Sequence, residues 1–173
     1  MKRDKISVVG FMGSGKTTIG LLLANFLNYF FYDLDGYIEK KEGKSIKNIF
    51  ADYGEEYFRN LESFYLEELI EKHNKIVIST GGGIIKREIN RKLLKEKTFV
   101  VFLDGSFEVF MNRLERAEEK DKRPLMSLGK DELYDLWISR KPLYEEVATL
   151  KINVDSKTPY QIVREILDFY GKM

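Results

Sequence analysis

Short apolar runs alternate with longer stretches of mixed polar and apolar residues along the whole chain. The short runs are rich in apolar and β-branched residues, which is typical of strands that are buried on both faces. They lie at residues 6–9, 29–32, 76–79, 98–103 and 149–154. Strands that are separated by helical stretches predict a parallel sheet with helices on both faces, a three-layer α/β/α fold with a five-stranded sheet.

The stretches between these runs carry helical patterns. Helices are expected at residues 16–27, 45–72 and 84–94, from Ser106 onward, and from about Thr158-Pro159 toward the end of the chain. Phe58, Leu61, Tyr65 and Leu69 recur at the three- and four-residue spacing of one helix face, and Gly54 before them is expected to break the helix.

Composition narrows the class of protein. The 173 residues are enough for one domain, and 29 Lys and Arg against 28 Asp and Glu argue against a broad basic surface for nucleic acid. The composition does not exclude a small, locally basic pocket for an anionic substrate. The absence of cysteine excludes disulfides, thiolate metal sites and a Cys nucleophile, and it is consistent with a cytoplasmic location.

No segment of the sequence has the pattern of a membrane anchor. The basic residues at the N-terminus precede a short apolar run that leads directly into Lys16, so we interpret this run as a strand and not as a signal peptide. The longest apolar region, residues 19–32, is interrupted by Asn25 and Asn28 and is too short to span a bilayer. We therefore expect a single soluble domain over residues 1–173, without a membrane partner.

Residues 10–17 read Gly-Phe-Met-Gly-Ser-Gly-Lys-Thr and match the phosphate-binding pattern G-x-x-x-x-G-K-[ST]. The glycines let the backbone curl so that several N–H groups point at one anion, and the helix that follows offers its positive N-terminal end to the same anion. Lys16 is expected to reach the β- and γ-phosphates of ATP, and Thr17 to ligate Mg²⁺. This loop alone does not name a reaction, because many kinds of nucleotide-binding protein carry it.

Two carboxylates, Asp33 and Asp35, follow the second predicted strand. On an extended strand, side chains at i and i+2 point the same way, and the carboxyl ends of strands line the ligand crevice of such a sheet. The pair is therefore a candidate to assist Mg²⁺ and accept a hydroxyl proton, although Asp35-Gly36 is also ordinary turn chemistry. The D-x-x-G pattern of GTPases is a poor alternative, since the guanine-reading N-K-x-D motif is missing.

Four further features of the sequence each have an ordinary structural explanation. The triplet Gly81-Gly82-Gly83 removes side chains where something approaches the backbone closely, although a tight turn is the alternative. Arg59 has Glu62 three residues later, so a local ion pair explains it equally well, and Arg140 by itself suggests a surface arginine. The charged stretch at residues 113–130 has the composition of a solvated loop.

Taken together, these features resemble the shikimate kinase family over nearly the whole chain. The matching motifs are residues 10–18, Asp33-x-Asp35, Phe58-Arg59-x-x-Glu62, Ser79-Thr80-Gly81-Gly82-Gly83, Arg123-Pro124-Leu125 and Arg140-x-Pro142-Leu143-Tyr144. Their order and spacing agree with the family throughout. The glycine triplet and the two motifs that contain Arg and Pro separate this family from other small-metabolite kinases.

The resemblance implies a transferase that phosphorylates the 3-hydroxyl of shikimate with ATP, a step of aromatic amino-acid biosynthesis. It assigns ATP binding to Gly13, Ser14, Gly15, Lys16, Thr17, Thr18, Arg116, Arg123 and Lys157. It assigns shikimate binding to Asp35, Arg59, Gly81, Gly82, Gly83 and Arg140. Catalysis is expected from Lys16, Asp35 and Arg123, with Mg²⁺ held by Thr17 and, through water, by Asp33.

The resemblance also changes the interpretation of the charged stretch. Residues 113–130 are expected to form a mobile lid that closes on the nucleotide and excludes water, and residues 36–72 a helical substrate-binding region. ATP and shikimate are then the only expected partners of a monomeric enzyme. The alternatives are a kinase for another small polyol acid, such as gluconate, and a nucleotide-binding regulatory module without turnover.

Overall fold

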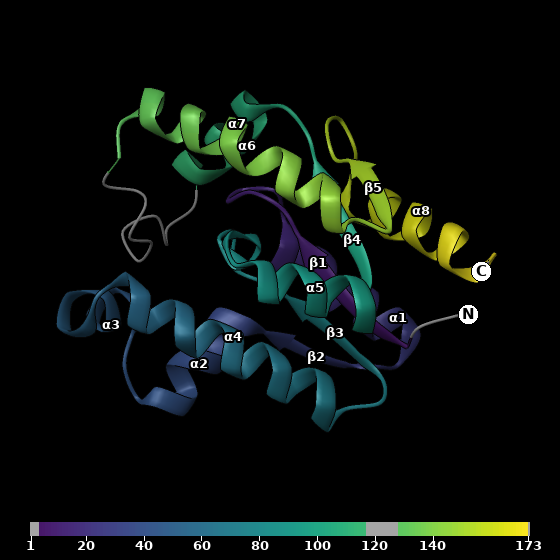
Figure 1. Ribbon diagram of the computed structural model, residues 1–173. Coiled ribbons are helices and arrows are strands. Elements are labelled where there is room, and N and C mark those ends of the chain that lie inside the picture. The colour runs from purple at the N-terminus through teal and green to yellow at the C-terminus, as the bar shows by residue number, and fades with distance from the viewer. Residues whose placement is uncertain (1–3, 117–127, 173) are drawn as a thin grey trace.

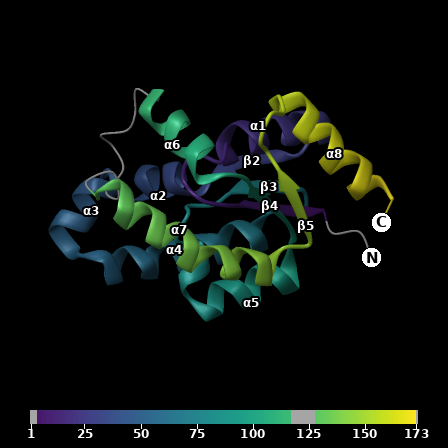
Figure 2. The same cartoon turned by 90° about the horizontal axis from the view of Figure 1, so that it is seen from above.

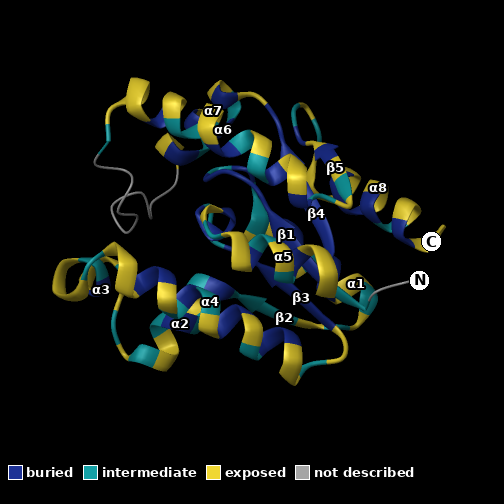
Figure 3. Ribbon diagram, viewed as in Figure 1, coloured by how far each residue is buried: buried dark blue, intermediate teal, exposed yellow. Residues whose placement is uncertain are grey.

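The computed structural model describes residues 4–116 and 128–172, and its centre is a five-stranded parallel sheet in the order β2-β3-β1-β4-β5 (Figure 1). The strands are β1 (Lys5–Val9), β2 (Phe30–Asp33), β3 (Ile76–Ser79), β4 (Phe99–Asp104) and β5 (Leu150–Asn153). Every predicted strand is present, and each end lies within one residue of its expected position. The inner strands β3 and β4 are buried along their whole length (Figure 3), which explains their uninterrupted apolar sequences.

Helices cover both faces of this sheet, so the fold is the predicted three-layer α/β/α arrangement. Figure 2 shows α1 (Lys16–Leu27) and α8 (Pro159–Gly171) on one side, with α5 (Glu88–Lys97) and α7 (Lys130–Val147) on the other. The helix α8 begins with a capping box, in which Thr158 and Gln161 satisfy each other's backbone N–H groups. Gly20 lets α1 approach β3, because a Cβ there would lie only 2.3 Å from Ser79 Oγ.

Three helices form a layer of their own beside the edge strand β2. They are α2 (Leu34–Glu42), α3 (Ile46–Tyr53) and α4 (Glu55–Lys72), and both α2 and α3 pack on α4. Gly54 separates α3 from α4 with a φ of 86°, a conformation that favours glycine, so the predicted break is confirmed. The remaining elements are the short 3₁₀ turn η1 (Ile84–Lys86) and α6 (Phe107–Arg116).

The structure corrects the expectation that Asp33 and Asp35 both lie on an extended strand. Asp33 ends β2 and is the N-cap of α2, where its Oδ2 accepts a hydrogen bond of 3.1 Å from the Gly36 N–H. Asp35 therefore lies in the first turn of a helix that the sequence pattern did not predict. The side-chain cap stabilises this helix start.

Two other boundaries differ from expectation. Residues 84–94 do not form one helix, because Arg87 is extended and separates η1 from α5, while the Asn90 side chain donates to the Ile84 carbonyl. The stretch at residues 113–130 is not a loop at its ends, since Arg113 to Arg116 belong to α6 and Lys130 begins α7. Within the described residues, no helix is long and apolar enough to cross a membrane.

Candidate active site

The loop between β1 and α1 curls around the ammonium group of Lys16. Lys16 Nζ donates to the carbonyl oxygens of Gly10 at 2.9 Å and of Phe11 at 3.0 Å. Gly13 and Gly15 have φ values of 80° and 95°, which side chains rarely adopt, so both glycines are needed for this curl. Gly15 also contributes no side chain to cap α1, which leaves the positive end of the helix suited to an anion.

The hydroxyl of Thr17 and the carboxylate of Asp33 lie together at the start of α1. Thr17 Oγ1 donates to Asp33 Oδ1 across 3.3 Å, which links the first turn of α1 to the end of β2. The part of the chain that the structure describes holds no group of three or more His, Cys, Asp or Glu side chains arranged for a metal. Mg²⁺ ordinarily takes only one or two protein oxygens and completes its shell with phosphates and water. The hydroxyl and carboxylate oxygens of this pair fit Mg²⁺ in that mode.

Asp35 and Glu62 bring two carboxylates together beside Gly81. A Cβ built on Gly81 would lie 2.9 Å from Asp35 Oδ1 and 3.2 Å from Glu62 Oε2, and neither oxygen has a hydrogen-bond partner among the described residues. Burial, together with the charges of Glu62 and Asp33, raises the pKa of Asp35 to about 7, against the opposing effects of Lys16 and Arg59. Asp35 is therefore suited to exchange a proton near neutral pH.

Arg59 lies in α4 and forms the local ion pair that its spacing suggested. Its Nη1 donates to Glu62 Oε1 at 2.7 Å, and Glu62 is only 1% exposed. Burial raises the pKa of Glu62, while the Arg59 guanidinium acts in the opposite direction. The ion pair is therefore part of the site itself, since the guanidinium also lies directly against Gly83.

Arg140 is not the surface residue that its sequence context suggested. It lies in α7 with an exposure of 4%, and its Nε is buried without a hydrogen-bond partner in the described chain. Burial lowers its pKa from the usual arginine value. A buried guanidinium with an unused donor is expected to bind an anion.

The glycine triplet is the place where these groups meet. A Cβ on Gly82 would lie 3.4 Å from Arg140 Nη1 and 3.6 Å from the carbonyl oxygen of Gly10 in the phosphate-binding loop. A Cβ on Gly83 would lie 2.5 Å from both terminal nitrogens of Arg59. The triplet therefore lacks side chains because two arginines, two carboxylates and the phosphate loop crowd around it.

Several predicted site residues lie apart from this cluster. Arg123 is outside the described residues. Arg116 is exposed at the end of α6, and Lys157 forms an ion pair of 3.0 Å with Glu165. Thr18 is exposed in the first turn of α1, and Ser14 is buried in the loop.

The sequence interpretation assigned no role to Arg113, which donates to the carbonyl oxygens of Gly13 and Ser14 at 3.4 and 3.2 Å. It lies one helical turn before Arg116 and shares its face of α6, so helical spacing was the available signal. It also gave Glu62 no role beyond its pairing with Arg59.

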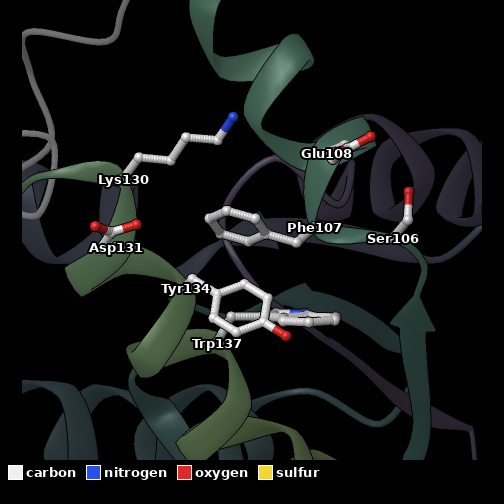
Figure 4. Close-up of a pocket in the computed structure, with 7 residues that line it drawn as sticks. All are labelled: Ser106, Phe107, Glu108, Lys130, Asp131, Tyr134 and Trp137. Carbon is white, nitrogen blue, oxygen red and sulfur yellow. The ribbon is translucent and has the colours of Figure 1, made fainter.

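A separate hollow of about 440 Å³ opens between α6 and α7 (Figure 4). Its lining consists of Ser106, Phe107, Glu108, Lys130, Asp131, Tyr134 and Trp137. The rings of Phe107, Tyr134 and Trp137 pack against one another, with centroids 5.3 to 5.7 Å apart. None of the predicted site residues lines this hollow, so we do not assign it to the candidate site.

Comparison with known proteins places these features in context. The family model described as "Shikimate kinase" matches residues 12–170. A shikimate kinase from Dictyoglomus turgidum is 52% identical over 166 residues, which cover 96% of both chains.

Among solved structures, shikimate kinase from Acinetobacter baumannii in complex with shikimate has a TM-score of 0.91 and 37% identity, and the match covers 97% of this chain and 93% of that one. A gluconokinase from Sinorhizobium meliloti has a TM-score of 0.59 and 21% identity, with 97% of this chain and 91% of that chain covered. This second likeness shows the fold alone.

Proposed function

This chain belongs to the shikimate kinase family and phosphorylates shikimate with ATP, and we propose that it does so by moving the γ-phosphoryl group of MgATP to the 3-hydroxyl in the crevice around Gly81, Gly82 and Gly83. The observation that carries the proposal is the meeting of Asp35, Arg59 and Arg140 at that triplet, beside Gly10 of the phosphate loop. A nucleotide site alone would not require this second, anion-binding half.

The donor half of the site binds the phosphates of ATP. Backbone groups of residues 13–18 surround the phosphates, and Lys16 neutralises charge on the group being transferred. Lys16 has to exchange its bonds to the carbonyls of Gly10 and Phe11 for phosphate oxygens, which requires only a rotation of its flexible side chain. Mg²⁺, held by Thr17 directly and by Asp33 through water, supplies further neutralisation of the phosphate charge when bound.

The acceptor half binds shikimate and prepares its hydroxyl. Arg59 and Arg140 reach the triplet from α4 and α7, and two guanidinium groups suit the planar carboxylate of shikimate. Asp35 orients the attacking hydroxyl and accepts its proton, a role that its raised pKa supports. Phosphoryl transfer needs little covalent help, so this positioning and the charge neutralisation account for most of the catalysis.

The remaining assignments rest on the resemblance. Arg123 closes over the transferred phosphoryl group, Arg116 packs on the adenine, and Lys157 lies beside it. Residues 113–130 act as the lid and residues 36–72 as the substrate-binding region of a single domain, which works as a monomer. Arg113 joins this set because it already contacts the backbone of Gly13 and Ser14.

The test is a steady-state assay of ADP release from MgATP with shikimate, with gluconate and without an acceptor. Shikimate is expected to raise the rate of ADP release by orders of magnitude, and ³¹P and ¹H NMR of the product should place the phosphate on the 3-hydroxyl. Turnover with gluconate would favour the kinase for another polyol acid. ATP binding with a rate of ADP release that ignores both acceptors would leave the regulatory module as the function.

A further inference from the structure

The carbonyl oxygens of the glycine triplet are all engaged, but one of them is held differently from the other two. Gly81 and Gly83 accept backbone hydrogen bonds from Ile84 at 3.2 Å and Lys86 at 3.1 Å, which form the η1 turn. The middle carbonyl, that of Gly82, accepts instead from the hydroxyl of Tyr144 at 2.5 Å. Tyr144 comes from α7, and it is the only side chain among the described residues that donates to the triplet's carbonyls.

The surroundings of Tyr144 keep its hydroxyl in place. The residue is only 1% exposed, and its ring packs on Phe102 of β4 with centroids 5.3 Å apart. Burial raises the pKa of Tyr144, while the nearby Arg140 charge acts in the opposite direction, so the hydroxyl stays protonated and can donate at neutral pH. The Tyr144 ring, which packs against the sheet, therefore holds its hydroxyl in position to donate to the Gly82 carbonyl.

This hydrogen bond fixes more than one oxygen atom. In a trans peptide the carbonyl of Gly82 and the N–H of Gly83 point in opposite directions, so holding one sets the direction of the other. Two adjacent glycines would otherwise let this peptide rotate at little steric cost. Within residues 4–116 and 128–172, the N–H of Gly83 has no hydrogen-bond acceptor, so its direction is free to serve a ligand.

The same peptide lies between the two halves of the site. A Cβ on Gly82 would lie close to both Arg140 Nη1 and the Gly10 carbonyl, and that carbonyl accepts from Lys16. Tyr144 follows Arg140 by one helical turn, so a single segment of α7 supplies both the guanidinium and the donor that holds the turn beside it. A rotation of the Gly82–Gly83 peptide would therefore disturb the groups that face the acceptor.

We propose that Tyr144 is a positioning residue for shikimate: its hydroxyl holds the Gly82–Gly83 peptide in one orientation, so that the triplet presents its N–H groups to the acceptor beside Arg140. Tyr144 does not itself contact the acceptor in this proposal. The inference rests on the proposed function, because it assigns the triplet to the acceptor half of the site.

The test compares Tyr144→Phe with the parent enzyme. Phe keeps the ring and its packing on Phe102 but removes the hydroxyl, which donates to the Gly82 carbonyl and also hydrogen-bonds the Arg140 side chain. We expect the KM for shikimate to rise about tenfold, the size of effect of one lost hydrogen bond at a charged site, with the KM for ATP unchanged within about twofold. An unchanged KM for shikimate in a folded variant would overturn the proposal.

Two matched variants separate positioning from general loss of stability. Tyr170→Phe removes a buried hydroxyl that is bonded to Asp4 at the opposite end of the sheet, so it should lower the melting temperature without raising the KM for shikimate. Tyr134→Phe changes an exposed tyrosine on the same helix α7 and should alter neither quantity. If Tyr170→Phe raised this KM as much as Tyr144→Phe, the effect would be one of stability and the proposal would fail.

A measurement on the parent protein covers the case in which Tyr144→Phe does not fold. In a sample labelled with ¹⁵N-glycine, addition of shikimate should shift the Gly83 amide signal strongly and leave that of Gly171, where an added Cβ would have no neighbour within 4 Å, unchanged. A Gly83 signal that does not respond would overturn the proposal. The failure of the proposed function is distinct, because the parent enzyme itself would then show no turnover that depends on shikimate.

Discussion

Asp35 and Glu62 direct one carboxylate oxygen each at the same side of Gly81, so that a Cβ there would meet Asp35 Oδ1 at 2.9 Å and Glu62 Oε2 at 3.2 Å. Glu62 is held by Arg59 through its other oxygen, at 2.7 Å, whereas Asp35 Oδ1 has no partner among the described residues. Two acids this close repel each other when both are ionised. The arrangement makes the protonation of Asp35 depend on the charge of Glu62.

The first prediction concerns this dependence. Glu62→Gln removes the negative charge that faces Asp35 but keeps an oxygen that can accept from Arg59. Because Glu62 is the largest charge that raises the pKa of Asp35 above its ordinary value, this pKa should fall below about 7. If Asp35 is the base, the acidic limb of the profile of kcat/KM against pH should move to lower pH by about one unit.

A control variant on the same helix isolates the charge effect. Glu68→Gln changes a carboxylate that accepts from Tyr37 at 2.6 Å, and it should leave the limb where it is in the parent enzyme. If the pH profile of Glu62→Gln coincided with that of the parent, the protonation of Asp35 would not depend on the charge of Glu62.

The second prediction concerns stability. The pKa of Asp35 is about 7 in the folded protein and 3.8 as a model value, so between these pH values the folded state holds a proton that the unfolded state has released. The contribution of Asp35 to stability is thus fully present below about pH 4 and is lost as the pH rises through 7. Asp35→Asn cannot ionise and avoids this loss.

The variant should therefore be more stable than the parent at pH 8 by up to about 4 kcal/mol, while the difference should be much smaller near pH 4. Urea denaturation at the two pH values measures it, and kcat should fall sharply in the same variant. An equal difference at both pH values would show that the ionisation of Asp35 is not the cause, and an unchanged kcat would remove its role as the base.

Much of the fold follows from local patterns in the sequence. The strands are short apolar runs, and their length and composition are typical of buried strands. Gly54 ends a helix through its backbone conformation, and Thr158 begins one through its cap, so both boundaries depend on nearby residues only. The residue pattern alone did not predict α2, because its start depends on the Asp33 side chain bonding to the Gly36 N–H, while the pattern of Asp-Gly favours a turn equally well. The helix α7 was not predicted, because Pro142 inside it suggests an end that packing overrides.

The site was predictable only where a motif fixes geometry locally. The glycines at residues 10–17 explain the curl of the phosphate loop, because Gly13 and Gly15 have positive φ values. By contrast, the burial of Arg140 and the hydrogen bond from Tyr144 to Gly82 depend on how α7 packs against the rest of the protein. The spacing of residues along the sequence does not reveal such long-range contacts. The family resemblance named Arg140, but not the hydrogen bond beside it.

The third prediction tests the crowding at the triplet. Gly83 has a φ of −91°, which any residue can adopt, so Gly83→Ala does not strain the backbone. Its Cβ would lie 2.5 Å from both terminal nitrogens of Arg59, so the guanidinium has to move. We expect the KM for shikimate to rise roughly tenfold to a hundredfold, because a bond between charged groups contributes about 1.5 to 3 kcal/mol.

The matched control is Gly171→Ala, at a position where a Cβ would have no neighbour within 4 Å. It should change neither KM. Isothermal titration with shikimate and with ATP distinguishes the two substrates, and equal losses for both in Gly83→Ala would contradict a specific displacement of Arg59.

The last prediction separates the two roles of Asp33, which caps α2 and faces Thr17. Asn is as good an N-cap as Asp, so Asp33→Asn should retain the melting temperature of the parent but lose the negative charge that supports Mg²⁺. Asp33→Ala loses both and should also be destabilised by about 1 kcal/mol. Titration of activity with MgCl₂ should show that both variants need more Mg²⁺ for half-maximal rate, roughly tenfold. If only Asp33→Ala required more Mg²⁺, the Asp33 carboxylate would act through the helix cap alone. Thr17 would then be the one residue of this pair that holds Mg²⁺.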